Sequence, residues 1–154
     1  DMAYFRSWLD YLTRLGVDGD AIVIEITESS FLDSSHQVQK NLEEFHRAGF
    51  KVAIDDFGTG YSSMGYLKKF DIDYLKIDRS FVANLKAGSD DMALCEAMIV
   101  MAHKLGMQVI AEGVETHDEY AALADFGIEL FQGYYFAKPL FEGLPEVPAS
   151  QYLI

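Results

Sequence analysis

Short apolar segments alternate along this chain with longer segments whose apolar residues recur at helical spacing. A parallel β-sheet with crossover helices produces this pattern, because its strands are buried on both faces and its helices on one. The strict order predicts an α/β fold with about five parallel strands. Helices are expected from Ser34 or Ser35 to Gly49 and over 63–70, 89–105 and 116–127. The expected strands are 21–26, 51–55, 74–78, 108–112 and 130–136.

The composition allows one sizeable core and argues against a polyanionic partner. The chain has 154 residues, of which 50% are hydrophobic and 14% aromatic, so a single compact domain is expected. Its formal net charge of −13 repels duplex nucleic acid. An anionic substrate would need a recruited cation, and Asp and Glu are the hard oxygen ligands that divalent metals prefer.

Apolar runs and cysteine content bear on the compartment. No apolar run approaches the roughly 20 residues that cross a bilayer, so no membrane contact is expected from this segment. The single cysteine, Cys95, has no partner for an intramolecular disulfide, which favours a reducing compartment. We expect a cytoplasmic location, either for the whole protein or for this part of a larger signalling protein. The start at Asp1 instead of Met leads us to expect a fragment of a longer chain.

Each expected strand ends its apolar run in polar side chains. In parallel α/β folds, ligands bind at the carboxyl ends of the strands, and a barrel brings many ends to one mouth. An open sheet would spread them along an edge, so the number of carboxylates favours a partial TIM-like (β/α) barrel. Any one of them could instead cap a helix, and Asp78 is expected to be such a cap. The polar residues are Glu25, Glu28, Asp55, Asp56, Lys76, Asp78, Glu112, Glu115 and Gln132.

The segment KVAIDDFGTGYSS places two like charges side by side. Asp55 and Asp56 repel each other at a rigid strand end, and a dication removes the cost of ionising both. With Glu25 and Glu112 from neighbouring strands, they could bind one or two Mg²⁺ or Mn²⁺ ions, which activate water and stabilise the leaving oxygen of a phosphodiester. Lys76 could neutralise developing charge or form an ordinary ion pair.

Five motifs carry a resemblance to a known family. They are IEITESSFL, AIDDFGTGYSS, YLKIDRSF, VIAEGVET and QGYYFAKPL, and their order and spacing resemble the EAL-domain family of bacterial cyclic-di-GMP phosphodiesterases. The resemblance implies a TIM-like barrel in which Mg²⁺ or Mn²⁺ activates water to open cyclic-di-GMP into linear pGpG. It covers nearly the whole chain.

The resemblance also implies a role for each motif residue. Glu25, Asp55 and Asp56 match metal ligands, and Glu112 matches a general base or additional ligand. Lys76 matches the lysine near the catalytic water. The supporting residues of the loop and pocket are Glu28, which braces the loop after Asp56, Glu115 and Gln132. The substrate loop holds Gly58, Thr59 and Gly60, whose glycines let it approach or close over a ligand.

The chain also departs from the family pattern. The glutamate of the Glu-Ala-Leu signature and the asparagine ligand of the next strand belong to family segments that precede this sequence. A closed barrel needs about eight strands. We therefore expect residues 1–154 to form a single partial EAL domain, impaired as a phosphodiesterase in isolation. Open strand edges at the two ends of such a sheet invite association, so a homodimer or oligomer is expected.

Three alternatives stay open at this point. The first is a regulatory module of the same fold that binds cyclic-di-GMP or a protein without hydrolysis. The second is an enolase-type metal barrel, which places its carboxylates one per strand and not as an adjacent pair. The third is an HD-type phosphodiesterase, suggested by His117 and Asp118, although these fall inside a Thr116 to Glu119 capping box.

Overall fold

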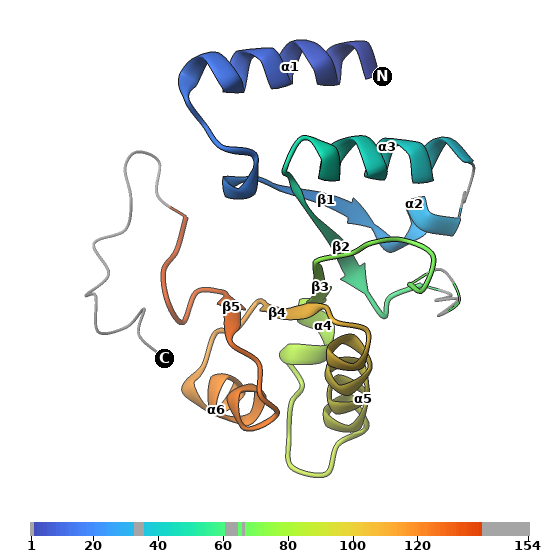
Figure 1. The fold of residues 1–154 in the computed structure, drawn as a ribbon. Helices are drawn as coiled ribbons and strands as arrows, with labels where there is room; N and C mark the ends of the chain where they lie inside the picture. Colours follow the sequence, from blue (N-terminus) through green and yellow to red (C-terminus); the bar gives the residue numbers. More distant parts are fainter. Residues whose placement is uncertain (1, 33–35, 61–64, 66, 140–154) are drawn as a thin grey trace. The chain divides into compact units, whose positions relative to one another are not determined.

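The computed structural model describes residues 2–32, 36–60, 65 and 67–139 (Figure 1). The chain divides into two units, Asp1–Leu75 and Lys76–Ile154, and the division falls inside strand β3 (Tyr74–Ile77). Five parallel strands alternate with helices, which confirms the predicted α/β fold class.

The first unit is built on two parallel strands. β1 and β2 pair from Val23 opposite Lys51 to Thr27 opposite Asp55. Three consecutive β2 residues, Val52 to Ile54, are buried, as expected for a parallel strand covered on both faces. The elements are α1 (Met2–Leu15), the 3₁₀ turn η1 (Gly19–Ala21), β1 (Val23–Thr27), α2 (Glu28–Leu32), α3 (His36–Arg47) and β2 (Lys51–Phe57).

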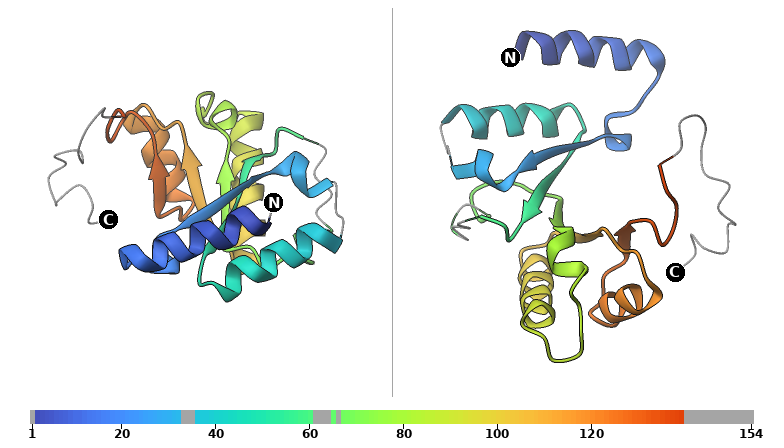
Figure 2. Two further views of the ribbon diagram at one scale, coloured as in Figure 1. Left: turned by 90° about the horizontal axis from the view of Figure 1, so that it is seen from above. Right: turned by 180° about the vertical axis from the view of Figure 1, so that it is seen from behind.

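Two helices of the first unit lie on the same side of β1 and β2, with α3 nearer the strands and α1 beyond it (Figures 1 and 2). Aromatic rings join them: Phe5 of α1 lies edge-on to Phe45 at 4.7 Å and to Phe50 at 5.7 Å between ring centroids. Helix α1 was not among the sequence predictions. The contacts of Phe5 show that apolar residues of α1 form a helix face that packs against α3 and against Phe50, which directly precedes β2.

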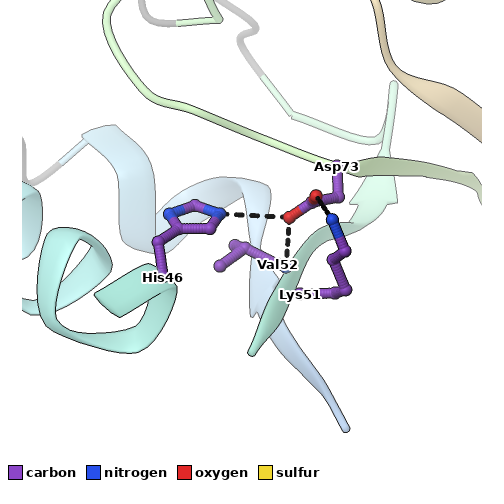
Figure 3. Close-up of polar contacts among 4 residues, drawn as sticks. All are labelled: His46, Lys51, Val52 and Asp73. Carbon is purple, nitrogen blue, oxygen red and sulfur yellow. Dashed lines mark hydrogen bonds and ion pairs between the residues drawn. The ribbon is translucent and has the colours of Figure 1, made fainter. Parts of the chain in front are cut away.

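The Asp73 carboxylate links three segments of the first unit through hydrogen bonds (Figure 3). Asp73 accepts hydrogen bonds from the Val52 backbone N–H at 2.9 Å and from Lys51 Nζ at 2.6 Å, and lies 3.1 Å from His46 Nε2. The Asp73 N–H donates to the Val52 carbonyl at 3.0 Å. This Asp73 network, defined as Asp73, Lys51, Val52 and His46, links the end of α3, the start of β2 and the approach to β3.

The second unit pairs β4 and β5 in parallel, with Ile110 opposite Leu130 and Glu112 opposite Gln132. Its two longer helices lie on one side of these strands (Figure 2). Besides the end of β3, its elements are α4 (Arg79–Val82), α5 (Asp90–Lys104), β4 (Gln108–Glu112), α6 (His117–Asp125) and β5 (Leu130–Gln132).

The two longer predicted helices of the second unit and the predicted capping box of α6 are confirmed. Ser89 caps α5 by accepting a hydrogen bond from the Met92 N–H, and Thr116 and Glu119 form the capping box of α6. The core face of α5 buries Met98, Ile99, Ala102 and the free thiol Cys95. Burial raises the pKa of Cys95 to about 11.

Other boundaries differ from the predictions. The first strand begins at Val23 and ends at Thr27, and the predicted caps Ser34 and Ser35 lie outside the described residues. The described part of 63–70 forms turns and a bend, where a short helix was predicted. The last strand ends at Gln132 and not at 136, because the chain turns there and the N–H groups of Phe136 and Ala137 both donate to the Gly133 carbonyl.

Candidate functional site

The carboxyl ends of β1 and β2 hold three of the predicted site residues. Glu25 pairs in register with Ala53, and Thr27 pairs with Asp55. Side chains two residues apart on a strand share a face, as do residues paired in register, so Glu25 and Asp55 lie on one face of this ladder. Glu25 is exposed and Asp55 is half-buried.

The backbone changes direction between the two adjacent aspartates. Asp56 has a φ of 55°, in the left-handed region that few residues other than glycine adopt. Its N–H donates to Asp55 Oδ1 at 3.1 Å, and its carbonyl accepts from Thr59 Oγ1 at 2.8 Å. The left-handed residue interrupts the regular alternation of a strand, so Asp56 begins a turn and does not simply occupy the opposite face.

Glu28 contacts the turn that follows Asp56. It is only 7% exposed, and its Oε2 accepts the Gly58 N–H at 2.9 Å. A Cβ atom at Gly60 would lie 3.0 Å from Glu28 Oε1, so a side chain at this position would crowd the carboxylate. The loop residues Gly58 to Gly60 are therefore shaped around Glu28, which is the arrangement expected of a brace.

In the second unit, Lys76 and Glu112 form a close ion pair at the ends of β3 and β4. Lys76 Nζ lies 2.7 Å from Glu112 Oε1, and the lysine is 3% exposed. A buried ammonium is costly unless a carboxylate partner is held near it. The pair is therefore a fixed, charged element of the site, and it is compatible both with a catalytic role and with the ordinary ion pair.

Gln132 is the last residue of β5, and Glu115 follows the end of β4 by three residues. Gln132 is opposite Glu112 in the β4–β5 register, and its carbonyl accepts the Val114 N–H at 3.1 Å. The Glu115 N–H donates to Glu119 Oε2 at 2.8 Å, which joins it to the capping box of α6. Both residues thus lie where β4 and β5 end, while their predicted supporting roles stay predictions.

Asp78 is a helix cap, as predicted. It accepts the Ser80 N–H at 2.9 Å at the start of α4. Partial burial works to raise its pKa, but the hydrogen bonds from the Ser80 side chain and backbone, with the charge of Arg79, bring the pKa below its ordinary value. His117 and Asp118 begin α6 within its capping box, 3.8 Å apart and both exposed, as helix-start residues do.

The strand ends of the first unit hold acids next to a glycine turn, and those of the second unit hold a buried lysine beside a carboxylate. Carboxylate oxygens are the ligands that divalent metals prefer. The chain belongs to the EAL domain family, whose model matches residues 2–139. This membership confirms the resemblance drawn from the five motifs and displaces the enolase-type and HD-type alternatives.

Related proteins carry the family's activity in their names. The chain is 42% identical over 129 residues to cyclic di-GMP phosphodiesterase NbdA of Pseudomonas aeruginosa, covering 84% of this chain and 16% of the relative. The solved PaMucR phosphodiesterase in complex with c-di-GMP is similar at 35% identity and a TM-score of 0.80, with 94% of this chain and 61% of that chain covered. A calcium and c-di-GMP complex of Klebsiella pneumoniae BlrP1 has 37% identity and a TM-score of 0.84, with 92% and 36% covered.

The chain matches only part of each of these relatives. It spans between 16% and 61% of their length. Solved EAL domains have a TIM-barrel-like fold, and BlrP1 has been solved with c-di-GMP and either calcium or manganese. No helix in the described part of the chain is long and apolar enough to cross a membrane.

Proposed function

We propose that this chain is part of a metal-dependent phosphodiesterase domain that hydrolyses cyclic-di-GMP to linear pGpG. The proposal is supported by family membership over residues 2–139 and by relatives named for this activity. The single observation that carries it is the Lys76–Glu112 pair, a buried cation held 2.7 Å from a carboxylate at the strand ends. A lysine held beside a carboxylate at a strand end would be placed to stabilise negative charge that develops on a bound phosphate.

The acids that would hold the metal fit its chemistry. Glu25, Asp55, Asp56 and Glu112 offer hard oxygen atoms, which Mg²⁺ and Mn²⁺ prefer, and we propose these two ions as the native cofactors. The bound metal would supply activated water and charge stabilisation of the phosphodiester. Lys76 would stabilise negative charge that develops on the phosphate, and Glu112 would orient Lys76 and accept a proton or add a ligand.

Hydrolysis tests the proposal directly. The purified chain is incubated with cyclic-di-GMP and Mn²⁺ or Mg²⁺, and the products are separated by chromatography. We expect slow conversion to pGpG, faster when the upstream coding sequence of the domain is restored. Asp55→Asn should abolish turnover, while the exposed Asp71→Asn serves as the matched control outside the strand ends.

The possible outcomes separate the two candidate functions. Binding of cyclic-di-GMP without turnover, even in the extended domain, would establish the alternative regulatory module. If the extended domain shows no binding of cyclic-di-GMP and no turnover, both candidate functions are refuted. Activity of Asp55→Asn within a few-fold of the parent would remove that residue from the mechanism.

Two further properties complete the proposal. Exposed apolar side chains on α1, with Trp8 at 40%, Tyr11 at 59% and Leu15 at 58% exposure, support self-association as a dimer or oligomer. A stable monomer in sedimentation at micromolar concentration would contradict it. The free thiol of Cys95 supports a cytoplasmic location, which cell fractionation tests.

A further inference from the structure

An anionic dinucleotide approaching this chain meets an acidic protein. With a formal net charge of −13, the surface repels phosphate groups unless cations stand at the binding site. Lys76 is one such cation, but it is 3% exposed and its charge is balanced by Glu112 at 2.7 Å. A second, more accessible cation at the same strand ends would therefore matter for binding.

Arg79 occupies that place. It follows the end of β3 by two residues, opens α4 and is exposed. Its side-chain stem lies directly against Gly113, the residue after Glu112: a Cβ atom at Gly113 would clash with the Arg79 Cβ and lie 3.4 Å from its Cα. Gly113 also has a φ of 69°, which side chains rarely adopt. Position 113, next to Glu112, therefore requires glycine, and the absence of a side chain there leaves room for the stem of Arg79.

The charges around Arg79 leave it available for an anion. The neighbouring Asp78 carboxylate is already engaged by the Ser80 N–H and hydroxyl as a helix cap. Hydrogen bonds from Ser80 are the main cause of the lowered pKa of Asp78, and the charge of Arg79 contributes least to it. A guanidinium carries five donors in a planar fork that matches two phosphate oxygens, and it stays charged at every physiological pH.

We propose that Arg79 is a substrate-binding residue that contacts a phosphate of the cyclic dinucleotide, with Gly113 fixing its stem beside the Lys76–Glu112 pair. The inference rests on the proposed function and adds to it a residue that the sequence analysis did not single out. The signal was present in the motif YLKIDRSF, but the contact with Gly113 is made across 34 residues and cannot be read from local spacing.

Binding of cyclic-di-GMP to the full chain in the presence of Ca²⁺ tests the proposal, with turnover in Mn²⁺ measured in parallel on the extended domain. Arg79→Ala should weaken binding about tenfold or more and raise KM with kcat nearly unchanged, because a lost charged hydrogen bond is of that size. Arg79→Lys should recover part of the affinity. The exposed Lys86→Ala is the matched control for loss of one positive charge, and it should stay within about twofold.

Salt and folding controls make the result decisive. The affinity of the parent should fall more steeply with added salt than that of Arg79→Ala, because one screened charge contact has gone. Circular dichroism should show unchanged folding, since Arg79 is exposed; if the alanine variant fails to fold, Arg79→Lys and Arg79→Gln carry the comparison. Equal binding by the Arg79 and Lys86 variants overturns this inference alone. Failure of the parent and the extended domain to bind the dinucleotide overturns the proposed function, and this inference with it.

Discussion

Replacing Asp73 by alanine should destabilise the first unit strongly. The substitution removes the acceptor of the Val52 N–H, and Val52 is fully buried. A buried donor left without a partner costs about 1 to 3 kcal/mol. The lost contact with His46 adds about 1 kcal/mol, and the half-exposed Lys51 pair adds little because solvent screens it. The expected total is about 3 kcal/mol.

Thermal and urea unfolding at neutral pH measure this loss. For a chain of this size, about 3 kcal/mol corresponds to a fall in Tm of about 6 to 12 °C. Asp73→Asn keeps a carbonyl that can accept the Val52 N–H, so it should lose roughly half as much. Asp71→Ala, exposed and two residues earlier, is the control and should change stability by less than about 0.5 kcal/mol. Equal melting of the Asp73 and Asp71 alanine variants would refute the reasoning.

The pH dependence gives an independent check on Asp73. Burial alone would raise its pKa, but the hydrogen bonds from Lys51, Val52 and His46 outweigh burial and lower it below the ordinary value. A depressed pKa means that the ionised group stabilises the fold above the unfolded pKa of about 3.9 and that this contribution is lost as the pH falls through the folded value. The parent should therefore lose stability below about pH 4 more steeply than Asp73→Ala.

Three further substitutions test the second unit. Gly133→Ala should lower the Tm by several degrees, because its Cβ would overlap the Val114 carbonyl oxygen and backbone must move; a melting curve like the parent's would contradict that contact. Thr116→Ala should cost about 1 kcal/mol through loss of the α6 cap, whereas Thr116→Ser should keep most of it in the same urea titration. Glu112→Gln removes the carboxylate partner of buried Lys76 and should cost about 3 kcal/mol besides abolishing turnover; full activity and an unchanged Tm would remove the pair from both roles.

Local signals in the sequence were sufficient for most of the second unit. The apolar period over 89–105 predicts α5, and the capping box of Thr116 and Glu119 predicts the start of α6; both helices start there. Strand β4 also has its predicted bounds, since all its determinants lie within five residues. The predicted end of β5 was wrong. The run of mostly apolar residues continues to 136, but hydrogen bonds to the Gly133 carbonyl turn the chain after Gln132.

The contacts that decide the chemistry are made between segments far apart in the chain, and local pattern could not predict them. Spacing placed Lys76 and Glu112 at two strand ends, but left open whether the lysine was solvated or buried against a carboxylate. The 2.7 Å contact shows that it is buried and paired. A paired lysine cannot by itself attract an anion to an acidic protein, because its field at a distance is cancelled by its partner. On the proposed function, the dinucleotide would be attracted by bound metal and by accessible cations such as Arg79, and Lys76 would act only on charge that develops within contact distance.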